Sequence, residues 1–131
     1  ATTPGNLDVS ALIDGGSGAV SLVATGSITL SATGAVVTQG ASVELRAGDD
    51  VTMDAAARLA SDDVVRVQAG DAIVAGTVDA GTASLVAGGA ISSAGTVTAS
   101  ALHVQAGGDV ALTVEAGTVA GVAGGTLTLS T

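Results

Sequence analysis

The sequence contains no phenylalanine, tyrosine or tryptophan, no cysteine and no lysine, and its 131 residues include a single proline. The absence of cysteine excludes a disulfide framework and thiolate metal sites. The absence of aromatic side chains leaves alanine, valine, leucine and isoleucine to build the core. Because hydrophobic residues still make up 47% of the chain and charged residues only 11%, the composition is too apolar for a disordered segment, and we expect one folded module over 1–131.

Positive charge is also scarce. Twelve acidic residues stand against three arginines, which gives a net charge of −9. Such a chain repels phosphate backbones and anionic lipid head groups, so we expect no nucleic-acid partner. Two stretches without carboxylate, Arg or Lys, 15–43 and 80–108, are long enough to span a bilayer, but they alternate apolar with small polar residues. This is strand patterning, and we expect no membrane insertion.

What the sequence has in abundance is a short phrase, Ala-Gly followed by an aliphatic residue, that recurs along most of the chain. The alanines that anchor its copies are 23, 22, 18, 19 and 17 residues apart. A repeat of this length is typical of a solenoid. The six anchors are Ala24, Ala47, Ala69, Ala87, Ala106 and Ala123.

One repeat consists of three short alternating segments, 20–24, 27–32 and 35–39, separated by turns that contain glycine. We expect three strands and three corners per coil, with glycine supplying positive φ at the corners. The pattern predicts an all-β fold, a three-sided parallel β-helix of six to seven coils of roughly 17–23 residues, with 1–17 as an irregular first coil and 18–131 as regular coils.

Stacking the repeats places like residues in columns that should point into one interior, because side chains alternate faces along a strand. Met53 takes the place held by Leu30 and Leu112, which predicts a core position. Glycine and β-branched residues throughout every segment argue against an amphipathic helix. The predicted inner columns are Leu22, Leu45, Val67, Leu85 and Val104; Val20, Val43, Val65, Ala83 and Leu102; and Ile28, Val51, Ile73, Ile91, Val110 and Leu127.

The phrase Val-x-Leu-x-Ala-Gly-Gly-Asp-Val-x-Leu, nearest here in 102–112 and 43–53, resembles the repeats of filamentous-haemagglutinin-like proteins. The resemblance covers roughly 18–131. It implies a right-handed β-helical shaft of a large bacterial exoprotein exported by two-partner secretion, located outside the cell or on the bacterial cell surface. The Asn-Pro-Asn type motif of that family's secretion domain is missing, and only 4–7 (Pro-Gly-Asn-Leu) comes near it. The resemblance therefore implies shaft without an export address or an effector domain.

Acidic residues at the corners are the first candidate site. Asp49, Asp50 and Asp71 are expected in one corner column of adjacent coils, and Asp109 returns to it later. Stacked carboxylates could bind Ca²⁺, which takes several oxygen ligands. The competing interpretation, which we favour, is a solvated acidic corner without any cofactor, because the Gly-Gly-x-Gly-x-Asp spacing of calcium-binding β-rolls does not recur.

The remaining polar candidates favour turn chemistry over catalysis. Asp62 and Asp63 precede a strand and Asp79 is expected at an equivalent bend, where aspartate bonds to local backbone groups. Neighbouring carboxylates rarely converge on one glycosidic bond, and sugar subsites usually use aromatic platforms. His103, the single histidine, should face solvent and forms no Ser/His/Asp arrangement. We expect no catalytic residue and no enzyme.

A threonine face for ice binding is disfavoured as well. Thr29, Thr52 and Thr128 share a column that other residue types interrupt, namely Val74, Ser92 and Ala111.

The chain shows no polar or helical cap, and its last residues, 126–131, still alternate. The sequence therefore predicts a structural and adhesive shaft whose open ends contact flanking repeats or other copies, and which meets a cell-surface receptor or glycan. A filament subunit that assembles by strand addition is the alternative. A Ca²⁺- or carbohydrate-binding solenoid is a third, weaker interpretation.

Overall fold

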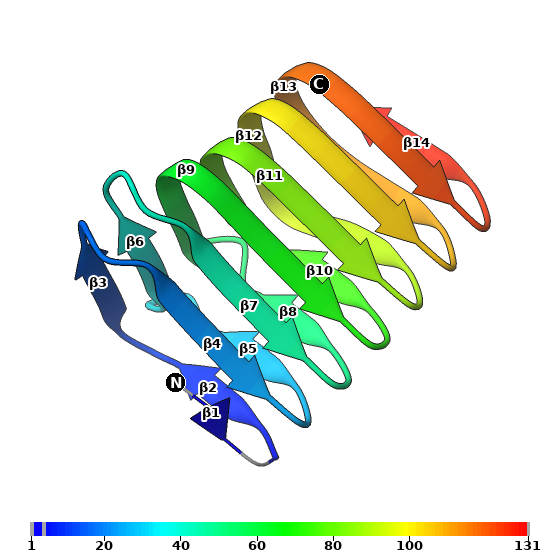
Figure 1. The fold of residues 1–131 in the computed structure, drawn as a ribbon. Helices are drawn as coiled ribbons and strands as arrows, with labels where there is room; N and C mark the ends of the chain where they lie inside the picture. The colour runs from blue at the N-terminus through cyan, green and yellow to red at the C-terminus, as the bar shows by residue number, and fades with distance from the viewer. Residues whose placement is uncertain (1, 4, 131) are drawn as a thin grey trace.

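The computed structural model describes residues 2–3 and 5–130, which form a right-handed parallel β-solenoid with three sides (Figure 1). Every strand pair within these residues is parallel, and no helix occurs among them. The all-β fold class is confirmed, and the stack has about seven coils, at the upper end of the six to seven that the sequence predicts. Three residues of the predicted 1–131 module, Ala1, Pro4 and Thr131, lie outside the described part.

Three parallel sheet faces, which we call A, B and C, follow one another in each coil. Face A contains β1 (Thr2–Thr3), β4 (Val20–Ala24), β7 (Val43–Ala47) and the final parts of β9 (Arg58–Ala69), β11 (Thr77–Ala87), β12 (Ile91–Ala106) and β13 (Val110–Ala123). Face B contains β2 (Leu7–Val9), β5 (Ile28–Leu30), β8 (Val51–Met53), β10 (Ile73–Ala75), the starts of β12 and β13, and β14 (Leu127–Ser130). Face C contains β3 (Leu12–Gly16), β6 (Ala35–Thr38), the starts of β9 and β11, and the middle parts of β12 and β13.

The core is one continuous column of aliphatic side chains along the solenoid axis. The predicted columns share a register, for example Leu22 opposite Leu45 and Leu45 opposite Val67. Met53 pairs with Leu30, and both are buried, which confirms the core position. Burial of each such side chain contributes about 1.5–3 kcal/mol to the free energy of unfolding. The narrow interior is filled without any aromatic side chain.

The three corners of the coil differ in how far their length varies. The corner from face A to face B, here called the Ala-Gly corner, always advances four positions from the anchoring alanine to the next inner residue, as from Ala24 to Ile28 and from Ala106 to Val110. The corner from face B to face C advances six positions from Met53 to Leu59 but only two from Leu112 to Val114. The varying repeat length is therefore absorbed away from the Ala-Gly corner.

The corner from face C to face A, here called the C–A corner, also shortens along the chain. It advances seven positions from Val36 to Val43 and five from Val97 to Leu102. In the tight later coils, β12 and β13 bend through successive corners as single long strands, whereas the wide early coils are divided into separate short strands (Figure 1).

Glycine at the Ala-Gly corner has a different purpose from the one predicted. Positive φ occurs among the described residues only at Gly5, Gly16 and Gly40. Gly5 lies at this corner in the first coil, but the glycines of the repeated Ala-Gly phrase have no positive φ, so the expectation is wrong for them. A Cβ on Gly70 would instead overlap the carbonyl oxygen of Gly48 in the coil beneath it, and Gly88 meets Gly70 in the same way. The glycines are required because successive backbones stack in direct contact, a contact that any side chain would disrupt.

Candidate functional site

The acidic residues of the Ala-Gly corner occupy two columns and not one, which corrects the prediction. The Asp71 backbone N–H donates to the Asp49 carbonyl at 2.8 Å, so these two residues stack directly. Asp50 and Asp109 occupy the next column, where each side chain lies beside the following coil. Asp50 Oδ1 accepts a hydrogen bond from the Ala72 N–H at 3.0 Å, and Asp109 Oδ1 accepts one from the Thr126 N–H at 2.8 Å.

The same column contains Asn6, whose Oδ1 accepts the Ser27 N–H at 2.9 Å. These side chains satisfy backbone donors that point along the stack at a corner where strand pairing is interrupted. Within the residues that the structure describes, no group of three or more His, Cys, Asp or Glu side chains lies close enough to hold a metal ion. The Asp50 carboxylate thus accepts a backbone donor of the next coil, whereas Asp49 and Asp71 are linked through their backbone atoms.

The second acidic group lies at the C–A corner. Asp62 and Asp63 sit inside the continuous strand β9, and the Asp63 N–H donates to the Ser61 hydroxyl at 3.0 Å. Asp79 is not at the equivalent bend, because it pairs with Ala60 in the middle of face C. Gly81 lies at the equivalent bend. It stacks directly on Asp62 and Asp63, because a Cβ on Gly81 would meet their backbone carbonyls. The predicted position of Asp79 was therefore wrong by two residues.

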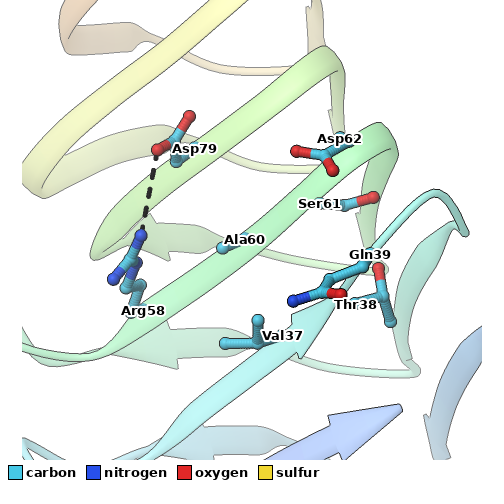
Figure 2. Close-up of a pocket in the computed structure, with 8 residues that line it drawn as sticks. All are labelled: Val37, Thr38, Gln39, Arg58, Ala60, Ser61, Asp62 and Asp79. Atoms are coloured by element: carbon cyan, nitrogen blue, oxygen red, sulfur yellow. Dashed lines mark ion pairs between the residues drawn. The ribbon is translucent and has the colours of Figure 1, made fainter. Parts of the chain in front are cut away.

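A hollow of about 290 Å³ opens on the outer surface of face C beside this corner (Figure 2). Arg58 and Asp79 form an ion pair at one side of it, with 3.9 Å between Nη2 and Oδ2. We call this feature the face C hollow. Its lining comes from three successive coils and consists of Val37, Thr38, Gln39, Arg58, Ala60, Ser61, Asp62 and Asp79.

Sequence reasoning placed Asp62 and Asp79 among turn residues and did not connect either with Arg58 or Gln39. The alternation of face C does indicate that Arg58 and Ala60 point outward, but the hollow depends on the different lengths of neighbouring C–A corners. The register shift between Ala80 and Thr82 records that difference. A register shift of this kind cannot be read from one repeat alone.

The single histidine lies on the outer side of face A. His103 is exposed and stands between Ser84 and Ala120 of the adjoining coils, as predicted. Glu44 and Arg66 form the other ion pair of the described residues, with 4.0 Å between Oε2 and Nη1, on the same face. The predicted threonine column is also confirmed in register on face B, including its interruption by Val74, Ser92 and Ala111.

The last described coil exposes positions that are buried in the coils beneath it. Val119, Leu127 and Leu129 are 39%, 41% and 36% exposed. Leu102, which pairs with Val119, is buried. These side chains face the end of the aliphatic column and have a coil on one side only.

No family model, no curated protein and no solved structure matches this chain. Among the described residues, no helix is long and apolar enough to cross a bilayer. The class that the fold defines is the three-sided parallel β-solenoid.

Proposed function

We propose that this chain is a non-catalytic shaft module of an extracellular bacterial exoprotein of the filamentous-haemagglutinin-like type, which holds an adhesive or effector part away from the cell. The observation that carries the proposal is the buried aliphatic column that runs from Val9 in the first coil to Val114 in the sixth, beside a corner of constant length. A column of this kind can be extended by further coils without a change of design, which suits a rod.

Surface chemistry also supports a rod outside the cell. The net charge of −9 favours solubility and disfavours nucleic acid or anionic membrane as partner. The phrase shared with filamentous-haemagglutinin-like repeats falls on the Ala-Gly corner and on the inner columns of faces A and B, which are the positions that fix the coil.

The test examines the coding sequence that flanks this segment together with the location of the product. The proposal expects further repeats of 17–23 residues, an outer-membrane transporter gene nearby, and recovery of the product in the culture medium or on the cell surface. A product found in the cytoplasm, or flanking sequence with an enzymatic domain that requires this segment for its active site, would contradict it.

A second candidate function is a filament subunit that assembles end to end. The inner column of face B favours it, because Leu127 and Leu129 continue that column in register with Val110 and Leu112, so a further coil of the same design, from this chain or from another copy, would extend it. Electron micrographs over a range of concentrations separate the two candidates. Long threads with one repeating mass support assembly, and discrete short rods at all concentrations exclude it.

A matched pair of variants sharpens this experiment. Leu127→Glu places a charge on the open end of the column, whereas Thr128→Glu places the same charge on the outer side of the same strand. Filament assembly should be lost in the first variant and retained in the second.

A further inference from the structure

The face C hollow results from a change of coil size. Its residues come from two wide coils, which contribute Val37–Gln39 and Arg58–Asp62, and from the first tight coil, which contributes Asp79. The C–A corner is one residue shorter at Gly81 than at Asp62 and Asp63, so the hollow lies where a wide coil is followed by a tight one.

Aliphatic side chains form the floor of the hollow. Ala60 lies in an outward row of face C between Val37 and Asp79 and is 9% exposed, at the bottom of the hollow. Val37 is half-buried beside it. A small apolar surface with converging polar groups above it is the usual composition of a small-molecule site.

Buried hydroxyl groups fix the rim at the C–A corner. Thr38 and Ser61, which are 3% and 6% exposed, both donate their hydroxyl hydrogen bonds to the carbonyl oxygen of Ala41. These bonds tie the loop of one wide coil to the strand of the next. Gln39 and Asp62, each adjacent to one of the buried hydroxyl residues, are therefore held in fixed positions while their own side chains remain exposed.

Four polar side chains surround Ala60: the guanidinium of Arg58, the carboxylates of Asp62 and Asp79, and the amide of Gln39 (Figure 2). The ion pair between Arg58 and Asp79 is long, at 3.9 Å, and both side chains are more than half exposed. A pair of this kind contributes little to stability, so a ligand that inserts between the two groups displaces little favourable energy.

We propose that the face C hollow binds a neutral saccharide through two adjacent hydroxyl groups. A hydroxyl group both donates and accepts, so one diol can donate to Asp62 or Asp79 and accept from Arg58 or Gln39. The two carboxylates repel an anionic ligand, and Arg58 repels a cationic ligand. A neutral diol can form hydrogen bonds with both kinds of group. The sugar ring then lies on Ala60 and Val37. These two aliphatic side chains take the place of an aromatic platform, which the sequence lacks.

This inference goes beyond the proposed function, because it assigns a binding site to the side of the shaft itself. Binding should be weak, in the millimolar range, because the hollow is shallow and lacks an aromatic ring. Repetition of the rod on a surface would raise the overall avidity.

The test is a titration of the whole chain, labelled with ¹⁵N, with methyl glycosides of glucose, galactose and mannose, followed by amide chemical shifts. At least one neutral glycoside should shift the amides of Val37–Gln39, Arg58–Asp62 and Asp79, and methyl glucuronide and glucosamine should bind more weakly. Arg58→Gln and Asp62→Asn should each weaken binding about tenfold or more, because each removes a charge-assisted hydrogen bond.

Arg66→Gln is the matched control. Arg66 has the same kind of exposed ion pair, with Glu44 at 4.0 Å, but lies on face A outside the face C hollow. The affinity of the Arg66→Gln variant for the glycosides should equal that of the unmodified chain. The inference is overturned if no neutral glycoside shifts these amides, if glucosamine or the glucuronide binds more tightly, or if the control loses binding to the same degree. Rods that form normally but bind no glycoside would refute this inference alone and leave the shaft proposal intact.

Discussion

The Ala-Gly corner and the C–A corner occur in the same coils but accept change very differently. The Ala-Gly corner keeps one length throughout and contains a glycine in each of five successive stacked positions: Gly48, Gly70, Gly88, Gly107 and Gly124. The C–A corner ranges from seven positions between Val36 and Val43 to five between Val97 and Leu102. It contains a left-handed glycine, Gly40, around which a Cβ would meet nothing within 4 Å.

Contact between backbones accounts for the difference. At the Ala-Gly corner, the carbonyl of one coil lies against the α-carbon of the next, so an added atom displaces a whole coil. At the C–A corner the chain moves away from the axis, and extra residues extend into solvent at small cost. The constant corner sets the stack, and the proposed saccharide site lies beside the C–A corner, where the coil length changes.

Insertion of Gly-Ser at each corner should give the largest contrast. Between Asp71 and Ala72 the insertion separates Ala72 from Asp50 and breaks the bond from the Gly89 N–H to the Asp71 carbonyl. We expect a loss of more than about 4 kcal/mol in the free energy of unfolding, measured by urea denaturation. The same insertion between Gln39 and Gly40 should cost less, about 2 kcal/mol, because it mainly disturbs the hydrogen bond from the buried Thr38 hydroxyl to the Ala41 carbonyl. Equal losses at the two corners would show that the contrast between them is wrong.

Substitution of single glycines isolates the steric part of the contrast. Gly70→Ala forces a Cβ onto the carbonyl oxygen of Gly48, a backbone atom that cannot rotate away, and should cost about 3 kcal/mol. Gly40→Ala introduces only the strain of a positive φ, which should cost about 1 kcal/mol. Thermal and urea unfolding of both variants provide the measurement. A smaller effect at Gly70 than at Gly40 would mean that the coils separate easily.

The stack was predictable from the sequence because its constraints repeat. Inner columns such as Leu22 over Leu45 depend only on strand alternation and on the spacing from the anchoring alanine, and both can be read from the sequence. The outward position of His103 and the burial of Met53 follow from the same alternation.

The candidate site was less predictable because it depends on features that do not repeat. Asp50 and Asp71 have the same spacing from an Ala-Gly pair to within one residue, and a shift of one residue at a corner changes the column and the hydrogen-bond partner. Asp79 and Arg58 are 21 positions apart and meet only because β11 pairs with β9 in a register that the corner lengths determine. The column assignments of the acidic residues were wrong for this reason, while the inner columns were correct.

The carboxylates of the Ala-Gly corner provide a finer test of what that corner requires. Asp50→Ala removes the acceptor for the Ala72 N–H and should cost about 1 kcal/mol, whereas Asp50→Asn retains an acceptor and should cost less than about 0.5 kcal/mol. Asp49→Ala, at the exposed neighbouring position, should change stability by less than about 0.5 kcal/mol. Addition of Ca²⁺ should leave the melting temperature of the unmodified chain unchanged, and a clear rise that Asp50→Asn abolishes would restore the calcium interpretation.

The smallest effect is expected on face C. Arg58→Gln removes an ion pair whose partners are 56% and 58% exposed and 3.9 Å apart, and it should change the free energy of unfolding by less than about 0.5 kcal/mol. Urea denaturation of this variant beside Gly70→Ala places the two regions on one scale. A decrease of more than about 1 kcal/mol in the free energy of unfolding would show that Arg58 stabilises the fold. A negligible loss would mean that face C and its C–A corner present a guanidinium and two carboxylates that folding does not need, which leaves these side chains available for a ligand.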